Sequence, residues 1–575
     1  MEPGSGPNRP FTLVRRLAGA LRRAMAKPPA QPPEYGATWI AHNNPPRLPA
    51  GELRTLWLTI ENRGTKIWQQ GTFLVSVDLD DTRILHLQLP HPVSSGERVT
   101  LHQVFRTISE AGPHEFKFAL VELDVTTFEA QGVPPLRVPF EIVESPVTET
   151  RRLRDRVLET HARCWLPCDG MSWSSDGPGY PQFAREAGGC RITDVEGREY
   201  VDYLMGWGCS LLGYSNERVQ RAIAGALGSA PMLTLTHCSM PEVGEILCDM
   251  FPGAESVTFG KNGSDVCTAA VRMARVHTGR PVVLFCGYHG WQDWYAERFG
   301  FPATGIPIRE EPLLVPFSPN NLEQVTQLLE VHRGQVAAVM LEPAGVIEGN
   351  SGPIQDADPV FLREMAALAR NDGALVIFDE IMTGFRYPGG SVQHATGVVP
   401  DLTCLGKALS AGMPLSALIG RREVFDSAIG RVFYEPTFKG ETYSFAAARE
   451  ALSIYREEDI PARVWSFGNR LRRMIDQICE RWGVPAAVIG PPFRMLLVFR
   501  EPDGRRRSLM RTLVQQELLR HGVLTTQLLL LPSAAHDDEA LEVTRRAFEH
   551  ALGVLAEAMQ DDRFASRLEI PPLPA

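Results

Sequence analysis

The 575-residue sequence predicts an α/β protein with a mostly parallel sheet, preceded by an all-β sandwich domain. Hydrophobic residues alternate with a period of two between about residues 35 and 145, which is typical of half-buried strands. After a charged segment at 149–156, apolar strands alternate with helical segments, a pattern that favours a parallel sheet. Four of these later strands are followed directly by polar or aromatic residues, as at a binding cleft.

Composition limits the classes of function. Hydrophobic residues make up 44% and charged residues 22%, as in ordinary globular proteins. The net charge of −10 argues against nucleic acid as a partner, and no apolar run approaches the roughly 18–20 residues of a membrane helix. The ten cysteines lack the paired spacing of a zinc site. We therefore expect no metal site, and reduced thiols in a cytoplasmic protein.

Residues 1–34 are expected to be a disordered basic leader and a proline-rich linker. Residues 1–33 hold six basic residues and one acidic residue. The segment 11–27 has the pattern of a basic amphipathic helix, so weak contact with an anionic membrane surface is an alternative to a disordered tail. An organelle-targeting role also stays open, because the segment is rich in arginine and poor in acids.

Residues 35–146 predict the β-sandwich. Short alternating runs are separated by turn signals such as Asn62-Arg63-Gly64 and Ser94-Ser95-Gly96. The stretch LPAGELRTLWLTIENRGTKIWQQG resembles immunoglobulin-like modules, among them the sugar-binding domains of polysaccharide exporters. No catalytic set of residues is present here. We therefore expect a binding, docking or dimer-supporting role, with a glycan or a protein as partner.

Four predicted strands end in residues that can bind a ligand. Because parallel strands present their carboxyl ends along one edge of a sheet, these residues are expected to form one cleft. The strands and the residues that follow them are 281–286 with Gly287-Tyr288-His289-Gly290, 336–341 with Glu342, 374–378 with Asp379, and 402–405 with Gly406-Lys407.

The segment FGKNGSD at 259–265 has the pattern of a phosphate-binding turn. It leads directly into a helical pattern, where free backbone N–H groups and the helix dipole favour an anion. Gly263 allows close approach of the backbone, and Ser264 adds a hydroxyl. A Gly-Ser helix cap would have the same sequence, so the motif alone leaves both interpretations open.

Together these segments resemble the fold-type I, class III pyridoxal-phosphate (PLP) aminotransferases, closest to the glutamate-1-semialdehyde aminotransferase branch. The resemblance covers about residues 180–560. It implies a linker and N-terminal aminotransferase segment at 147–190, a PLP-binding large domain at 191–455 with helices on both sheet faces, and a small α+β domain at 456–565. The motifs that carry it are DVEGREYVDYLMGWG, GSDVCTAAVRMARVHTGR, YHGW, FDEIMTGFR, PDLTCLGKALSAGMPLSALIGRRE and SAAHDDEAL.

The resemblance assigns roles to the residues after the strands. Lys407 would hold PLP covalently and shuttle the proton between carbons, whereas Asp379 would keep the pyridine nitrogen protonated. Tyr288 would stack on the cofactor, and Glu342 would face cofactor and substrate. His289 would pack or hydrogen-bond in the site, with a purely structural histidine as the alternative. Trp207, after Met205-Gly206, could line a substrate pocket or serve only as core packing.

The segment FKGETYSFAAA at 438–448 matches the place where the family has a threonine that reaches the phosphate of the neighbouring subunit. Thr442 is the candidate, and a simple helix cap is the alternative. The resemblance therefore implies a homodimer whose active sites are shared between subunits.

Two segments depart from the branch. The stretch CDGMSWSSDGPGYPQ at 168–182 lacks the Ser-Pro-x-Arg pattern that holds glutamate semialdehyde, and the loop after Glu342 is longer than usual. We therefore expect an aminotransferase that moves an amino group from an amino-acid donor to a carbonyl acceptor, with a hint of carbohydrate or polysaccharide biosynthesis from the sandwich. The alternatives are an intramolecular 2,1-aminomutase and a non-catalytic scaffold or binding protein.

Overall fold

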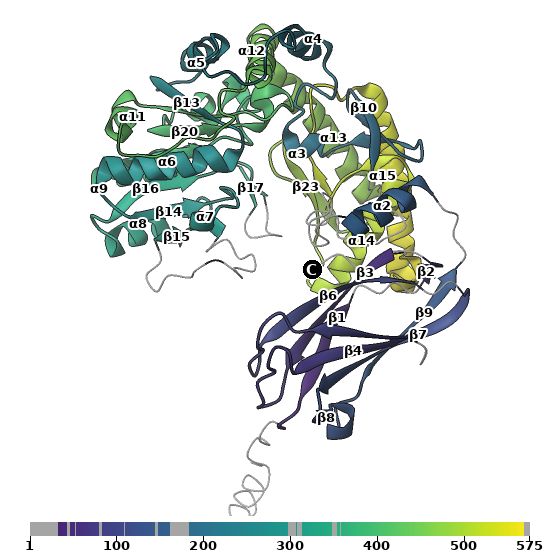
Figure 1. The fold of residues 1–575 in the computed structure, drawn as a ribbon. Coiled ribbons are helices and arrows are strands. Elements are labelled where there is room, and N and C mark those ends of the chain that lie inside the picture. Colours follow the sequence, from purple (N-terminus) through teal and green to yellow (C-terminus); the bar gives the residue numbers. More distant parts are fainter. Residues whose placement is uncertain are drawn as a thin grey trace, which may run out of the picture. The chain divides into compact units, whose positions relative to one another are not determined.

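The computed structural model describes residues 33–42, 47–51, 53–79, 83–107, 110–143, 148–160, 183–296, 306, 313–347, 354–356 and 358–568. These residues belong to two compact units. The first comprises Met1–Val147 and Arg154–Arg163, and the second Thr148–Leu153 and Cys164–Ala575 (Figure 1). Residues 1–32 of the predicted leader and linker, and the segment 168–182, lie outside the described residues. Within the described part of the chain, no helix is long and apolar enough to cross a membrane.

The first unit contains two packed sheets, which confirms the predicted all-β sandwich. One sheet has the strand order β1-β3-β6, and the other β2-β9-β7-β4-β5 with β8 paired to β7. Leu58 and Ile60 of β3 share one buried core with Val75 and Val77 of β4. The strands are β1 Ala37–His42, β2 Arg47–Pro49, β3 Leu53–Asn62, β4 Phe73–Leu79, β5 Arg83–Gln88, β6 Arg98–Arg106, β7 Gly112–Glu122, β8 Thr126–Thr127 and β9 Leu136–Val143.

The second unit is built on a seven-stranded sheet with the order β13-β21-β20-β19-β16-β14-β15. All neighbouring strands from β20 to β15 pair in parallel, whereas β21 is antiparallel to both β13 and β20. The sheet is therefore mostly parallel, as predicted. Its strands are β13 Ser256–Gly260, β14 Val282–Cys286, β15 Leu314–Pro316, β16 Val336–Leu341, β19 Leu375–Asp379, β20 Leu402–Leu405 and β21 Ser416–Gly420.

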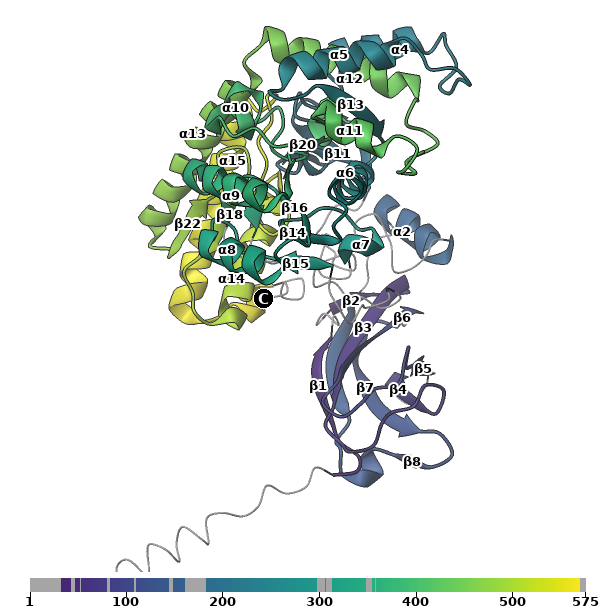
Figure 2. The same cartoon turned by 90° about the vertical axis from the view of Figure 1, so that its left-hand side faces the viewer.

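Helices cover both faces of this sheet (Figures 1 and 2). Val282 and Leu284 of β14 belong to the core shared with α5, α8, α9 and α12, whereas Val283 and Phe285 belong to the core shared with α6 and α11. Alternate residues of one strand thus face opposite helix layers, which explains the continuous apolar runs in the sequence. The helices are α5 Ser239–Met250, α6 Gly263–Thr278, α8 Leu322–Val331, α9 Pro359–Asp372, α11 Arg422–Ala428 and α12 Thr442–Glu457.

A separate buried core unites the C-terminal helices with two small sheets. The sheets have the orders β22-β23-β25 and β10-β11-β12-β24. This α+β part agrees with the expected fold class. Its elements are α13 Ile460–Trp482, α14 Gly504–Arg520, α15 Asp538–Asp561, β10 Ala184–Gly188, β11 Arg191–Asp194, β12 Glu199–Asp202, β22 Ala486–Ile489, β23 Met495–Phe499, β24 Val523–Leu524 and β25 Leu529–Leu530.

The remaining elements are short or connect these parts. The eight cysteines within the described residues are all free, and five of them are buried. The connecting elements are α2 Glu149–Thr160, α3 Met205–Gly208, α4 Glu217–Ala226, α7 Asp293–Ala296, α10 Val392–Thr396, β17 Val346–Ile347 and β18 Ile354–Gln355.

Candidate active site

The four strand ends singled out in the sequence lie on adjacent strands of the large sheet. Strands β20, β19, β16 and β14 are consecutive neighbours. The residues at their ends therefore meet at one edge, where they line a single cavity of about 1120 Å³. The cavity is lined at these ends by Tyr288, His289, Glu342, Asp379 and Lys407.

Lys407 follows β20 in a turn whose backbone conformation is uncommon for a lysine. Its φ of +45° lies in the left-handed region, which costs a non-glycine residue about 1 kcal/mol or more. The surrounding structure holds this conformation, so the lysine is fixed at the strand end. Burial lowers the pKa of the Lys407 amine, and the carboxylates of Glu342 and Asp379 offset part of that effect. More of the amine is therefore neutral and nucleophilic near neutral pH than for an exposed lysine.

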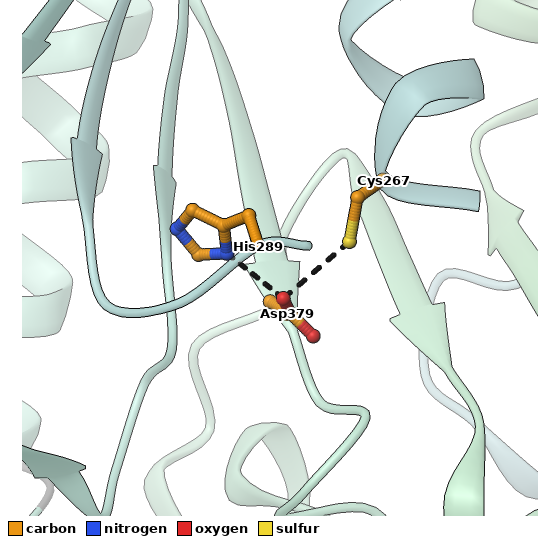
Figure 3. Close-up of side chains that lie close together, drawn as sticks. All are labelled: Cys267, His289 and Asp379. Atoms are coloured by element: carbon orange, nitrogen blue, oxygen red, sulfur yellow. Dashed lines mark hydrogen bonds and ion pairs between the residues drawn. The ribbon is translucent and has the colours of Figure 1, made fainter. Parts of the chain in front are cut away.

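Asp379 is the last residue of β19 and accepts hydrogen bonds from three sides. Its Oδ2 lies 2.8 Å from Nδ1 of His289 and 3.4 Å from Sγ of Cys267 (Figure 3). Its Oδ1 accepts from the backbone N–H of Ile381 at 3.1 Å. Asp379 and His289 are almost fully buried. A carboxylate held in this way has a fixed direction, and its negative charge is little screened by solvent.

Cys267, His289 and Asp379 lie close enough together to be considered as metal ligands. Burial raises the pKa of the Cys267 thiol well above its usual value. A protonated thiol is a hydrogen-bond donor. The distances from Asp379 therefore describe a hydrogen-bond network in which Cys267 and His289 orient Asp379.

Glu342 follows β16 and connects two parts of the cavity wall. Its Oε2 accepts from the backbone N–H of Tyr288 at 3.0 Å, and its Oε1 lies 3.2 Å from Nη1 of Arg494. Tyr288 is 46% exposed, so part of its ring is accessible in the cavity. Gly287 has a φ of +104°, and a Cβ built on it would lie only 2.7 Å from Oε2 of Glu342. This glycine permits the close approach of the two strand ends.

Gly263 and Ser264 begin α6 beside the same cavity. Asn262 and Asp265 form a capping box at this end, so the helix starts at a defined residue. A Cβ at position 263 would lie 2.6 Å from Cδ1 of Ile381, so only glycine fits without movement. The turn thus combines close backbone approach, a hydroxyl and the positive end of a 16-residue helix.

Thr442 does not line the cavity of its own chain. It is 3% exposed, and its hydroxyl donates to the carbonyl of Ala230 at 3.2 Å. Glu441, which caps α12 ahead of it, forms an ion pair with Lys261 at 2.9 Å. Lys261 does line the cavity. The start of α12 is therefore linked to the turn at 259–265 through Glu441 and Lys261 rather than through Thr442.

Several cavity residues were not expected from the sequence. Cys267 lies on α6 behind Asp379, and three arginines reach the cavity from the C-terminal part of the chain: Arg494, Arg507 and Arg511. For Trp207 the sequence allowed either a pocket or a core position, and the structure shows that it lines the cavity. Its backbone φ is +59°. No local sequence motif indicated that these arginines line a cavity, because an arginine in a turn or on a helix surface is commonly exposed to solvent.

Comparison with known proteins identifies relatives of the second unit. The family model described as aminotransferase class-III matches residues 174–296 and 300–551. The chain is 31% identical over 345 residues to 3-aminobutyryl-CoA aminotransferase from Cloacimonas acidaminovorans, covering 60% of this chain and 82% of that protein. It is 32% identical over 407 residues to glutamate-1-semialdehyde 2,1-aminomutase from Methanothermobacter thermautotrophicus, covering 65% and 93%.

A solved structure shares the same fold. The PLP internal aldimine form of the FumI protein from Sphingopyxis sp. MTA144 superimposes with a TM-score of 0.63 at 27% identity. The match covers 72% of this chain and 97% of that one. An omega-transaminase from Sphaerobacter thermophilus gives the same TM-score at 24% identity.

Proposed function

The chain belongs to the class-III aminotransferases, and we propose that it transfers an amino group from an amino-acid donor to a carbonyl acceptor at the cavity around Lys407. It is a PLP-dependent enzyme of fold type I. The observation that carries the proposal is the convergence of Lys407, Asp379, Glu342 and Tyr288 from four adjacent strand ends. The experiment is a half-reaction screen of amino donors followed by carbonyl acceptors, keto-sugars included.

The residues present fit PLP. A Cβ at Gly263 would require the Ile381 side chain to move, and Ser264 lies beside a helix N-terminus, which suits a phosphate. The buried carboxylate of Asp379 is proposed to hold a protonated ring nitrogen, and its hydrogen bonds with His289 and Cys267 support a fixed direction for it. Tyr288 offers a partly exposed ring for stacking. When bound, PLP supplies an electron sink for the C–H bond broken beside the transferred nitrogen.

Lys407 carries two tasks in this proposal. Its amine attaches the cofactor covalently and, once released, moves a proton between the two carbons that exchange the amino group. Burial favours the neutral amine that both tasks need. Glu342 holds the Tyr288 backbone in place and keeps a negative charge close to the amine.

The pKa of Lys407 makes a testable prediction. The charge of Glu342 raises this pKa, and the charge of Arg494 lowers it. Glu342→Gln removes the raising effect and leaves Arg494 without the carboxylate that pairs with it. The pKa of the Lys407 amine should fall further below its usual value. Covalent capture of PLP by the apoenzyme, followed by absorbance, should therefore reach half its maximal rate at a lower pH in Glu342→Gln than in the wild type. A midpoint that moves to higher pH would contradict the proposed coupling.

We further propose a homodimer in which Thr442 serves the partner's active site. Thr442 docks against the carbonyls of Ala230 and Pro231. Two large apolar side chains that lie within a few residues of Pro231 and Thr442 in the sequence are exposed: Leu235 at 80% and Phe438 at 58%. Large apolar side chains that are exposed in one chain are a feature of surfaces that another subunit covers. This arrangement supports an active site built by two chains.

Mixed dimers of two inactive variants test the shared site. Lys407→Ala and Thr442→Ala homodimers should each be impaired, because each lacks one component of every site. A Lys407→Ala/Thr442→Ala heterodimer should recover activity, since one of its sites keeps both Lys407 and the partner's intact threonine. If each site used its own Thr442, no heterodimer site would be complete. Activity of purified, doubly tagged heterodimers that does not rise above the parent homodimers would contradict the shared site.

An intramolecular 2,1-aminomutase is the second candidate function. The similarity to glutamate-1-semialdehyde 2,1-aminomutases favours it. A mutase needs no external amino donor, whereas an aminotransferase stops after one half-reaction without an acceptor. Turnover that requires both an added amino donor and an added carbonyl acceptor therefore indicates an aminotransferase rather than a mutase. A non-catalytic scaffold would need neither the buried hydrogen-bond network around Asp379 nor the uncommon backbone conformation of Lys407, so both features favour an enzyme.

The N-terminal sandwich is proposed to be an immunoglobulin-like module that binds a glycan or a protein. Its two sheets around one core support this class. A glycan partner would connect the enzyme with carbohydrate or polysaccharide biosynthesis. The protein is proposed to be cytoplasmic, and contact of the leader with an anionic membrane surface stays a prediction outside the described residues.

A further inference from the structure

Two packed helices of the C-terminal part bring two histidines and a glutamate together outside the active-site cavity. Glu517 lies in the last turn of α14, His521 follows the end of that helix, and His550 lies on α15. One possible ligand atom from each residue lies within 4.8 Å of the other two. None of the three lines the cavity around Lys407. The cluster therefore has no part in the proposed amino transfer.

Helix geometry and packing place these side chains. Glu517 and His521 are four residues apart, so they share one face of α14. The backbone N–H of His521 donates to the carbonyl of Glu517 at 3.2 Å, which continues the helical spacing to the histidine. Leu518 of α14 and Ala551 of α15, the neighbours of Glu517 and His550, belong to one buried core. The packing of the two helices thus brings the two halves of the cluster together.

Glu517 is held so that one of its oxygens faces a histidine. The residue is only 4% exposed. Its Oε1 accepts from Nη1 of Arg520 at 2.7 Å and from Nε2 of Gln516 at 3.0 Å. Its Oε2 lies 3.4 Å from Nε2 of His550. Carboxylates that bind a metal are commonly oriented by such outer hydrogen bonds.

The spacing of the donor atoms suits one small divalent cation. Zinc binds imidazole nitrogen at about 2.0–2.1 Å and carboxylate oxygen at about 2.0–2.2 Å in tetrahedral geometry, so two such ligand atoms are about 3.3–3.5 Å apart. The 3.4 Å between Glu517 Oε2 and His550 Nε2 falls in this range. The ring centroids of His521 and His550 are 4.0 Å apart, which brings a second imidazole to the same place.

A direct ion pair between His550 and Glu517 explains the cluster less well. Hydrogen bonds between a charged nitrogen and a carboxylate are commonly about 2.7–2.9 Å long. The separation of 3.4 Å is longer than that. Two protonated imidazoles at the distance of His521 and His550 would also repel each other. A shared cation accounts for both distances.

We propose that Glu517, His521 and His550 bind one divalent transition-metal ion, with Zn²⁺ as the preferred ion. Two imidazoles and one carboxylate leave the fourth position of a tetrahedral ion to water. Imidazole ligands favour zinc over Mg²⁺ and Ca²⁺, which prefer oxygen. The spacing of the cysteines could not indicate this site, because its ligands are histidines and a glutamate from two helices.

The position of the site predicts a stabilising role. A metal ion there would connect the end of α14 to α15 and hold the chain that follows. Gly522, with a φ of +77°, comes directly after His521 and leads into β24, which pairs with β12. Thr526 and Gln527 follow β24 and line the active-site cavity. We therefore expect bound zinc to stabilise this part of the second unit against unfolding.

Zinc titration of the full-length holoenzyme tests the site. The protein is treated with EDTA and dialysed, and ZnCl₂ and MgCl₂ are then titrated separately in a calorimeter. We expect saturable binding of one zinc ion per chain and no binding of Mg²⁺ at the same concentrations. With zinc at about 100 times its Kd, the midpoint of thermal unfolding should rise by about 2–5 °C.

Histidine variants assign the binding to the cluster. His521→Gln and His550→Gln should each weaken zinc binding by at least about tenfold, because loss of an outer hydrogen bond alone costs about 10–100-fold. Both histidines are exposed, so both variants should fold. His91→Gln is the matched control: Nδ1 of His91 also lies near a glutamate, 3.7 Å from Oε1 of Glu97, but in the sandwich. Its zinc affinity should equal that of the wild type.

Cobalt provides a spectroscopic readout of the same site. Co²⁺ bound by nitrogen and oxygen ligands in a four-coordinate site absorbs visible light, and this band should appear in the wild type, vanish on addition of zinc and be absent from His550→Gln. Lack of zinc binding to the wild type, or equal zinc affinity in the wild type and both histidine variants of the cluster, would overturn the site. Either result would leave the aminotransferase proposal standing, because no ligand of the proposed metal lies in the cavity.

Discussion

Lys407→Ala is expected to lose both the near-visible absorbance of lysine-bound PLP and amino transfer. Removal of the covalent attachment and of the proton shuttle together should lower the rate by at least about 10²–10⁴-fold. Lys407 follows β20 closely, and the charges of Glu342 and Asp379 act on its amine. Lys261 also lines the cavity, but its amine is already paired with Glu441. Absorbance spectra and single-turnover rates measure the two losses.

Two controls separate this role from a structural one. Lys117→Ala removes a lysine of the sandwich and should leave spectrum and rate unchanged. Added methylamine should partly restore proton transfer in Lys407→Ala, because a free amine can enter the space left by the side chain. An unchanged spectrum in Lys407→Ala would remove Lys407 from its proposed role.

Asp379→Asn is expected to have the second-largest effect. The amide keeps the size of the side chain but removes the negative charge that holds a protonated ring nitrogen. Loss of one such preorganised electrostatic group costs about 10²–10³-fold in kcat. Stopped-flow measurement of the half-reaction with an amino donor gives this number, and reconstitution with N-methyl-PLP should recover part of it because that ring keeps its positive charge.

Asp401→Asn is the matched control for loss of a buried carboxylate. Asp401 is also almost fully buried, but it pairs with Arg421 and accepts from the backbone of Val376. Its replacement should lower thermal stability and leave activity per folded molecule unchanged. If Asp379→Asn retained full activity, or if Asp401→Asn were equally inactive while folded, the role of Asp379 would be wrong.

The sheet and its strand ends could be predicted because local sequence determines them. A run such as 336–341 is apolar on both faces and ends at a charged residue, which is compatible with a buried parallel strand and little else. The alternation in 75–79 determines a two-faced strand in the same way. Lys407, Asp379, Glu342 and Tyr288 could be singled out because each lies within two residues of the end of such a strand, and the family resemblance suggested their roles.

The position of Arg494, Arg507 and Arg511 at the cavity could not be predicted, because tertiary packing determines it. Arg494 is 87 residues from Lys407 in the sequence, and its place depends on how the turn before β23 packs beside Gly345. The spacing of Arg507 and Arg511 shows that they share a helix face, but not what that face covers. The Cys267 contact with Asp379 likewise depends on the packing of α6 against β19. Thr442 stays a prediction, since its proposed partner atoms belong to a second chain.

The most direct test of amino transfer follows the nitrogen itself. Holoenzyme is mixed with a ¹⁵N-labelled amino donor without acceptor, and the cofactor is released by denaturation and weighed by mass spectrometry. The account predicts stoichiometric ¹⁵N in the cofactor, which disappears when a carbonyl acceptor is added and reappears in the aminated acceptor. Absence of label from the cofactor for every donor tested, or label that never reaches a second molecule, would contradict the assignment as an aminotransferase.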